Sequence, residues 1–143
     1  MNDKTIIGIG KCLCGVISIQ ANTMKTKIGA CHCDMCRNWG GGPFMAVDCG
    51  TDVQFNAGDN IAVYNSSAWA ERGFCKLCGS HLFYRLKESQ QYIMPVGLFE
   101  AVDEFIFDHQ IFIDKKPAYY CFSNKTRDMT GEEVFAHYAP VIE

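Results

Sequence analysis

Two short segments, Cys12-Leu13-Cys14-Gly15 and Cys75-Lys76-Leu77-Cys78-Gly79, decide how this chain folds. In each segment a glycine follows the second cysteine, as expected where the chain turns sharply after a metal ligand, because glycine adopts positive φ without steric cost. Neither pair can complete a tetrahedral metal site alone. We therefore expect the two pairs to form one four-cysteine cluster that binds zinc and ties the start of the chain to its middle. The cluster consists of Cys12, Cys14, Cys75 and Cys78.

A third group of cysteines lies between these segments, in Cys31-His32-Cys33-Asp34-Met35-Cys36. Its three thiolates could face one ion if a short loop leads into a helical turn. Structural zinc sites are almost always closed by four ligands, whereas catalytic sites have three protein ligands and an open position. The sequence therefore predicts a second zinc at a site where chemistry takes place. Its ligands would be Cys31, Cys33 and Cys36, which we call the triad.

Other roles for the cysteines remain open. Nine cysteines could form disulfides, but an odd count and an N-terminus without a leader pattern argue against a disulfide framework. The triad could instead hold a structural metal completed by His32 or by a distant residue. In an extended backbone the His32 side chain points away from those of its neighbours, so we expect it at the surface or supporting the ligands. We expect Cys49 and Cys121, which stand alone, to be small buried residues.

The composition is that of a single domain spanning residues 1–143, with 48% hydrophobic and 13% aromatic residues. A net charge of −3 and a pI near 5.8 weigh against nucleic acid as a partner, since a zinc-bearing domain that binds it should have a basic face. No apolar run is long enough to cross a bilayer, so no membrane partner is expected. Many free thiols fit a reducing compartment, which predicts a cytoplasmic protein. Oligomeric state has no signal in the sequence.

Short segments rich in β-branched and aromatic residues follow one another too closely for crossover helices. They predict a mainly β fold of antiparallel strands, with Pro95 at an edge or bulge because proline cannot donate to a ladder. A short C-terminal helix is expected where Thr130 and Glu133 form a capping box. Its apolar face would contain Val134, Phe135 and Tyr138. The predicted strands are residues 16–19, 43–47, 53–55, 61–64, 70–74, 81–86, 92–98 and 105–107.

Three motifs stand in order along the chain: Cys-x-Cys-Gly at Cys12–Gly15, Cys-His-Cys-x-x-Cys-Arg at Cys31–Arg37, and Phe-Cys-x-x-Cys-Gly-Ser at Phe74–Ser80. This order resembles the glutathione-dependent formaldehyde-activating enzyme family. Residues 107–120 resemble the family's C-terminal strand and its Lys-x-Pro-Trp-like turn, with Tyr119-Tyr120 where the family more often has Trp. The resemblance implies a zinc-stapled, mainly β fold of the Mss4-like (β-tent) type.

The resemblance also implies the metal sites and the reaction. The four-cysteine cluster would hold a structural zinc, and the triad would hold a catalytic zinc near a glutathione site. Zinc deprotonates a thiol that coordinates it. A glutathione thiolate held in this way could add to a small aldehyde such as formaldehyde to give S-hydroxymethylglutathione, and the reverse step is a carbon–sulfur lyase reaction. Glutathione and a small electrophile are therefore the expected partners.

Four residues outside the triad are candidate substrate-binding residues. Arg37 could pair with a glutathione carboxylate or form a structural salt bridge. Trp39 and the glycines after it, including Gly41, could form a loop that approaches the ligand closely, or simply a turn before a strand. Lys115, beside Lys116, could contact glutathione or be solvated.

Two other classes of function stay open. A zinc-stapled binding module would need only the four-cysteine cluster, because this type of fold also serves proteins that bind a partner without catalysis. A thiol redox protein would use Cys33 and Cys36 as a dithiol. That motif usually begins a helix in a βαβ setting, which a strand-rich chain does not offer.

Overall fold

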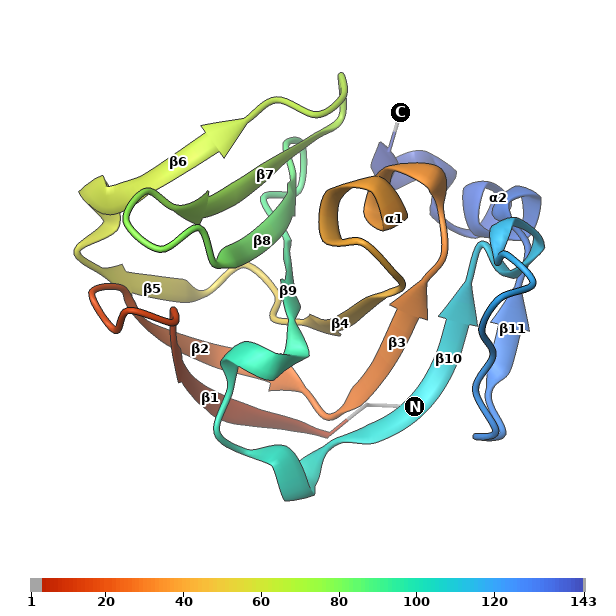
Figure 1. The fold of residues 1–143 in the computed structure, drawn as a ribbon, viewed down its shortest axis with the longest axis horizontal. Coiled ribbons are helices and arrows are strands. Elements are labelled where there is room, and N and C mark those ends of the chain that lie inside the picture. Colours follow the sequence, from red (N-terminus) through yellow and green to blue (C-terminus); the bar gives the residue numbers. More distant parts are fainter. Residues whose placement is uncertain (1–3, 143) are drawn as a thin grey trace.

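The computed structural model describes the backbone of residues 4–142 and the side chains of residues 4–137. Within this part of the chain, eleven strands form two sheets, accompanied by two α-helices and short 3-10 turns (Figure 1). The strands are β1 (Thr5–Lys11), β2 (Ser18–Lys25), β3 (Lys27–Cys31), β4 (Phe44–Asp48), β5 (Val53–Asn56), β6 (Ile61–Tyr64), β7 (Ala70–Cys75), β8 (His81–Leu86), β9 (Tyr92–Pro95), β10 (Ile106–Ile111) and β11 (Arg127–Met129). The helices are α1 (Asp34–Gly40) and α2 (Gly131–Ile142), and the 3-10 turns are η1 (Gly58–Asn60), η2 (Val96–Leu98), η3 (Val102–Glu104) and η4 (Ile113–Lys115). Neither helix, over its described residues, is long and apolar enough to cross a membrane.

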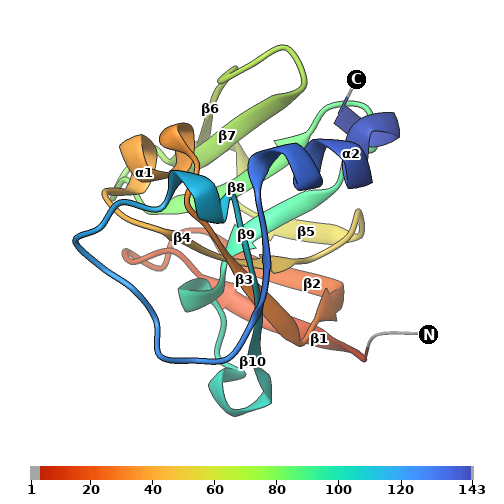
Figure 2. The same cartoon turned by 90° about the vertical axis from the view of Figure 1, so that its right-hand side faces the viewer.

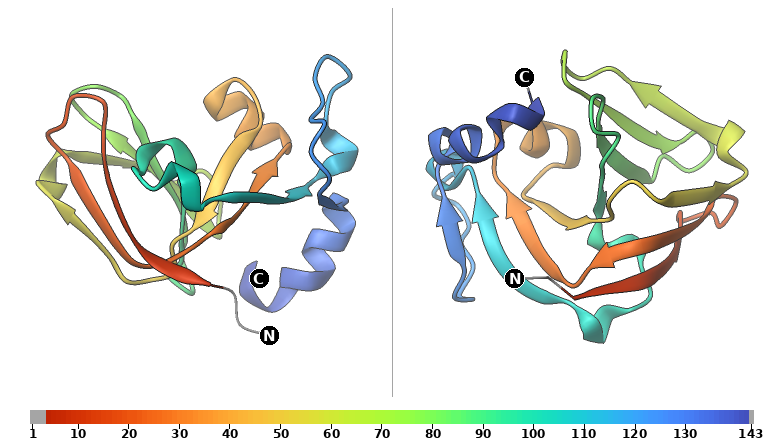
Figure 3. Two further views of the ribbon diagram at one scale, coloured as in Figure 1. Left: turned by 90° about the horizontal axis from the view of Figure 1, so that it is seen from below. Right: turned by 180° about the vertical axis from the view of Figure 1, so that it is seen from behind.

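The two sheets share one continuous stretch of chain. A small sheet has the order β1-β2-β5, and a large sheet has the order β11-β10-β3-β4-β9-β8-β7-β6. Strand β2 ends at Lys25 and β3 begins at Lys27, so the chain passes from one sheet to the other at Thr26, which is buried. Figure 3 shows the large sheet curving around the small one. The faces of the two sheets that pack against each other must therefore be apolar.

The core fills the space between the sheets. Strand β2 alternates exposed and buried residues, because successive side chains of a strand point to opposite faces. Its inward-facing Ile19 and Ala21 meet Val47 of β4, Leu82 of β8 and Met94 of β9 in one cluster of buried residues. Fully burying a valine, leucine, isoleucine or methionine side chain stabilises a fold by about 1.5–3 kcal/mol. The core thus fixes the register of both sheets and the ends of the strands that carry the cysteines.

The prediction of a mainly β fold is confirmed, with three corrections. Strand β10 is parallel to both β3 and β11, so the large sheet is mixed rather than antiparallel (Figure 1). Strand β9 ends at Pro95 and lies inside the sheet, between β4 and β8, so the prediction of an edge was wrong. Pro95 is tolerated because it pairs with Ala46 of β4 only. The residues of β9 that pair with β8 come earlier in the strand. Residues 96–98, predicted as strand, form the turn η2.

The C-terminal helix α2 begins at the predicted capping box. The backbone N–H of Glu133 donates to Thr130 Oγ1 at 3.1 Å, and the N–H of Thr130 donates to Glu133 Oε1 at 2.7 Å. Val134 is buried, whereas Phe135 is 47% exposed and its ring lies edge-on to Phe112. Tyr138 lies outside the described side chains. Figure 2 shows α2 as an outer element of the molecule.

Candidate metal centres and active site

The four-cysteine cluster is assembled by two loops from different sheets. Cys12 directly follows β1, and Cys75 ends β7. All four sulfurs lie within 4.8 Å of one another. The Sγ atoms of Cys12 and Cys14 are 3.5 Å apart, and those of Cys14 and Cys75 are 3.9 Å apart. Tetrahedral zinc with Zn–S bonds of about 2.3 Å requires sulfurs about 3.8 Å apart, so the donor set fits zinc.

The surrounding backbone supports this cluster. Gly15 and Gly79 have φ of 82° and 77°, as predicted from their position after the second cysteine of each pair. The backbone N–H of Ile17 donates to Cys12 Sγ at 3.4 Å. Ser80 joins the two loops, because its hydroxyl accepts the N–H of Leu13 at 2.9 Å and contacts Cys78 Sγ at 3.2 Å. Sulfurs that accept hydrogen bonds while held this close are typical of metal-bound thiolates.

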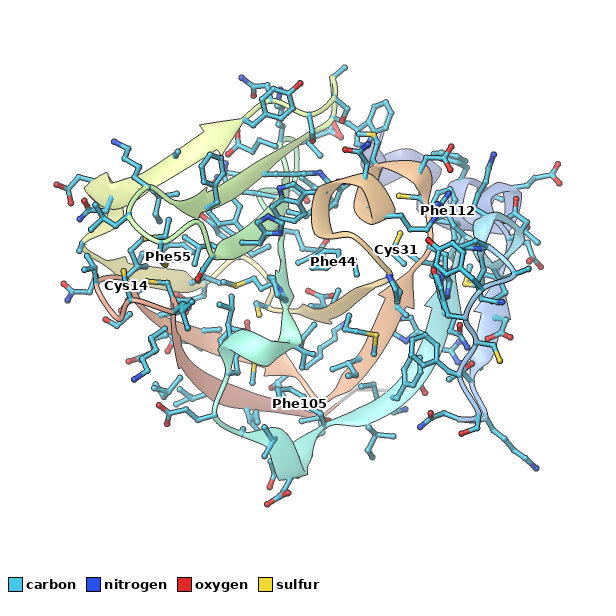
Figure 4. The ribbon with its side chains drawn as sticks, in the orientation of Figure 1. Cys14, Cys31, Phe44, Phe55, Phe105 and Phe112 are labelled. Atoms are coloured by element: carbon cyan, nitrogen blue, oxygen red, sulfur yellow. The ribbon has the colours of Figure 1, made fainter. Side chains whose placement is uncertain are left out.

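The triad forms where β3 meets α1. The first turn of α1 is the helical turn that was predicted for this segment. Cys31 ends β3, Cys33 is the N-cap of α1, and Cys36 lies in its first turn. Their sulfurs lie within 4.8 Å of one another. Cys31 and Cys36 are buried, whereas Cys33 is half-buried. Figure 4 shows Cys31 below α1 and Cys14 far from it at the left, so the two clusters are separate sites.

The triad is electrostatically suited to bind a cation. Cys33 Sγ accepts the backbone N–H of Cys36 at 3.4 Å, which is the usual geometry of a helix N-cap. Hydrogen bonds from the thiols of Cys31 and Cys36 lower the pKa of Cys33 well below its ordinary value. The same contact with Cys33, together with burial, raises the pKa of Cys31. At least one member is thus a thiolate at neutral pH, and three thiolates are stable together only when a cation neutralises them.

All nine cysteines lie in the described part of the chain, where each is a free thiol. Cys49 is fully buried, as predicted. Cys121 is exposed, so its predicted burial was wrong; it lies in the long connection between η4 and β11, which has little regular structure. The pair Cys33 and Cys36 does begin a helix, but β3 and β4 on either side of it are antiparallel, which is not a βαβ setting.

His32 is completely buried, so the prediction of a surface residue was wrong and its alternative, support of the ligands, fits the structure. Its Nε2 lies 2.7 Å from Gln110 Oε1, and its Nδ1 lies 2.8 Å from the hydroxyl of Tyr120. Gln110 Nε2 donates in turn to Thr126 Oγ1, so its Oε1 must accept the His32 Nε2 proton, and Tyr120 donates to Nδ1. Burial lowers the pKa of His32, which agrees with this neutral tautomer. Both ring nitrogens are engaged, and His32 does not complete the triad.

Arg72 is a residue of the site that the sequence reasoning missed. It lies in β7 with only 4% of its surface exposed, and its two terminal nitrogens are 3.8 and 3.7 Å from Cys36 Sγ. The guanidinium is held over the rings of Trp39 and Tyr84, at 4.9 Å from each centroid. Strand alternation could have revealed it, because Arg72 shares the buried face of β7 with Ala70, and a buried arginine needs an anion.

The predicted substrate-binding residues of α1 have structural contacts. Arg37 Nε donates to the carbonyl of His32 at 3.0 Å, and Nη2 pairs with Asp34 at 2.7 Å, so the salt-bridge alternative is realised. Trp39 stacks on His81 with ring centroids 3.9 Å apart. Gly41 has φ of 87° and ends α1 as its C-cap.

Lys115 ends η4, and Lys116 follows it directly. Lys115 is exposed. Lys116 Nζ donates to the carbonyl of Tyr120 at 2.8 Å and lies over that ring, at 5.6 Å from its centroid. Lys116, rather than Lys115, thus contacts a residue that hydrogen-bonds to His32.

A cleft of about 500 Å³ opens beside the triad. One wall comes from α1 and the loop into β4, and the other comes from the turn before β8 and from η2. Its lining residues are Cys36, Trp39, Gly40, Pro43, Phe44, Met45, Gly79, Ser80, His81, Pro95, Gly97 and Leu98. The cleft therefore reaches from a triad cysteine, Cys36, to the residues that follow Cys78.

Fold and site together define a class: a two-sheet β protein with one four-cysteine cluster and one three-cysteine cluster that could each hold a metal ion, the second of them beside a cleft. Residues 8–115 match the family model described as glutathione-dependent formaldehyde-activating enzyme. The chain belongs to this family. The family is one of enzymes, and the prediction of an enzyme is confirmed at that level.

Individual relatives agree with this assignment. A Schizosaccharomyces pombe protein named as an uncharacterized lyase is 39% identical over 126 residues, which cover 87% of this chain and 92% of that protein. A Podospora anserina protein, provisionally named a glutathione-dependent formaldehyde-activating enzyme, is 30% identical over 91 residues, 59% of this chain and 42% of that protein. The crystal structure of a Rhodobacter sphaeroides protein has a similar fold, with a TM-score of 0.54, 21% identity, and coverage of 65% of this chain and 88% of that one.

Proposed function

We propose that this protein is a zinc-dependent carbon–sulfur lyase-type enzyme that joins or cleaves glutathione and a small aldehyde such as formaldehyde. The observation that carries the proposal is the triad: three sulfurs gathered within 4.8 Å, one of them lining a cleft, in a chain of this family. A site that only stabilised the fold would be closed by a fourth ligand. The names of the relatives, a lyase and a formaldehyde-activating enzyme, support the same reaction class.

The reaction forms or breaks one carbon–sulfur bond. In the forward direction the thiol sulfur of glutathione bonds to the carbonyl carbon, and the thiol proton ends on the carbonyl oxygen, giving S-hydroxymethylglutathione. Cys31, Cys33 and Cys36 would hold the zinc, which would lower the pKa of a thiol bound to it. The cleft beside Cys36 holds the aldehyde next to that thiol, and proximity of this kind lowers the barrier by replacing a bimolecular encounter.

The residues around the triad have distinct roles in this proposal. His32 fixes the backbone between Cys31 and Cys33 through its two hydrogen bonds. Arg72 places a positive charge against Cys36 and offsets part of the negative charge of three thiolates. Arg37, whose side chain is 26% exposed, remains our candidate for a glutathione carboxylate. Trp39 contacts the substrate from the wall of the cleft, whereas contacts by Gly41 and Lys115 remain predictions from the sequence.

The binding-module alternative explains less of the structure. It requires the four-cysteine cluster alone and gives no reason for three further sulfurs to converge. It also gives no reason to bury Arg72 against one of them, since a buried charge is costly without a partner. The triad is therefore better explained as a catalytic metal site.

Reduced glutathione should bind far more tightly than S-methylglutathione, because a thioether is a poor zinc ligand. Binding should also release a proton, since a thiol with a pKa of about 8.5 is mostly protonated at neutral pH and loses its proton on coordination. Calorimetry in two buffers of different ionisation enthalpy measures the release. Equal affinity for the two compounds, or no binding of either at millimolar concentration, would exclude the thiol mechanism.

Replacing Arg72 with leucine should weaken metal binding at the triad by about tenfold or more, because the Cys36 thiolate loses its charge-assisted partner. Chelator competition measures the affinity, and the sulfur-to-cobalt charge-transfer band of the cobalt-substituted protein reports the change at sulfur. The Arg72→Lys variant should recover part of the affinity.

Arg85→Leu is the matched control for this prediction. Arg85 lies on the adjacent strand β8, pairs with Glu71 at 3.2 Å and stacks on Tyr92, but contacts no cysteine. The Arg85→Leu variant should lower the free energy of unfolding without shifting the charge-transfer band of the cobalt-substituted protein. If both variants leave the band and the affinity unchanged, Arg72 has no role at the metal.

A further inference from the structure

We propose that the cleft beside Cys36 binds the apolar group of the electrophile, so that the preferred substrates are aldehydes with an alkyl or aromatic substituent rather than formaldehyde alone. This inference rests on the proposed function and names the substrate class of the same site. It is carried by the size of the cleft, the chemistry of its walls and its continuity with the triad.

The size of the cleft exceeds what formaldehyde needs. Its volume is about 500 Å³. A water molecule takes up about 30 Å³ in the liquid, so a molecule of two heavy atoms fills a small part of such a space. A six-carbon aldehyde would occupy much more of it and would still place its carbonyl carbon near Cys36.

Apart from Cys36, the walls carry no formal charge. Among the twelve lining residues there is no Lys, Arg, Asp or Glu. Glutathione has two carboxylates and an ammonium group, and these need charged or strongly hydrogen-bonding partners when they leave water. The cations near the triad are Arg37, Arg72 and Lys116, and none of them lines the cleft. The cleft thus suits the carbon skeleton of the electrophile better than the tripeptide.

The apolar surface is held in place before any ligand binds. Trp39 stacks on His81 at an interplanar angle of 5°, and Phe44 meets Trp39 edge-on with centroids 5.9 Å apart. The guanidinium of Arg72 also lies over Trp39, so the indole is held by three neighbours. Preformed aromatic walls with few polar groups are typical of sites that bind apolar ligands. The bond formed is the same carbon–sulfur bond as with formaldehyde, and the carbonyl oxygen again receives the thiol proton.

Two glycines that line the cleft allow it to be filled from different segments of the chain. A Cβ added at Gly40 or at Gly97 would meet no atom within 4 Å, and neither residue has positive φ. Gly40→Leu and Gly97→Leu should therefore fold normally while reducing the space. Gly58→Leu is the control, because Gly58 lies on η1 outside the cleft, is exposed, and has only one ordinary contact with Phe55 at 3.8 Å.

The first measurement needs no reaction. Benzyl alcohol, which resembles the reduced form of an aromatic aldehyde and does not react, should shift the backbone amide signals of Gly40, Ser80 and Gly97 in NMR spectra. Each cleft variant should weaken this binding by at least about tenfold, which is the loss expected when a few apolar groups are no longer buried. The control should bind as the unaltered protein does.

The second measurement is turnover with glutathione. Both cleft variants should reduce kcat/KM for hexanal at least about tenfold more than kcat/KM for formaldehyde, because the larger aldehyde fills more of the cleft. The inference is overturned if benzyl alcohol shifts none of these amides, or if both aldehydes lose activity equally. If benzyl alcohol binds as expected but no aldehyde is turned over, the proposed reaction is excluded. The inference that the cleft binds apolar groups is then still supported.

Discussion

The Cys75→Ser variant is expected to lose its structural zinc and to unfold, or to melt far below the unaltered protein. Cys75 is fully buried at the end of β7, and its sulfur lies 3.9 Å from that of Cys14, which is 61 residues away. Zinc binding at structural sites is worth about 10–16 kcal/mol in small zinc domains. Domains are stable by about 5–15 kcal/mol in total, so much of the stability depends on this site. Elemental analysis and thermal unfolding followed by circular dichroism measure both effects.

Cys49→Ser is the matched control for that experiment. Cys49 is also fully buried, but it belongs to neither cluster. Burying its hydroxyl should cost about 1–3 kcal/mol, with the zinc content unchanged. Equal destabilisation of the two variants would show that the four-cysteine cluster contributes nothing beyond packing. Protein purified without zinc and with paired cysteines would contradict the metal assignment itself.

The Cys33→Ser variant is expected to lose the second zinc and all turnover while keeping its fold. Cys33 is the N-cap of α1, and serine is one of the best N-cap residues, so the helix should keep its first turn. The triad lies within six residues of one segment, so its metal does not join distant strands. Zinc per chain should fall from about two to about one, with the melting temperature nearly unchanged. If Cys33→Ser unfolds as Cys75→Ser does, the triad is a structural site.

The cysteine clusters could be predicted because the triad and each pair of the four-cysteine cluster are encoded locally, and neither pair can complete a tetrahedral site alone. Short spacings place the ligands of one pair, and a glycine after the pair supplies the positive φ found at Gly15 and Gly79. The capping box of α2 and most strands were predicted for the same reason. These features depend on a few consecutive residues.

The supporting contacts could not be predicted because they join distant segments. His32 meets Gln110 and Tyr120, which are 78 and 88 residues away, across the parallel pairing of β10 with β3. A single strand pattern does not specify whether its partner runs parallel or antiparallel. Arg72 meets Cys36 across 36 residues. The residues next to Arg72 in the sequence do not indicate which residue it contacts, although strand alternation places Arg72 on a buried face.

The separation of the two sites along the chain has a consequence for synthesis on the ribosome. The three triad cysteines have been translated by residue 36 and all four ligands of the four-cysteine cluster by residue 78, whereas the partners of His32, Gln110 and Tyr120, come much later. Domains fold from the N-terminus as they emerge, at about 5–20 residues per second. A nascent chain can thus complete the four-cysteine cluster seconds before the triad gains its support. The triad cysteines emerge early, but the segment that holds them in place emerges last.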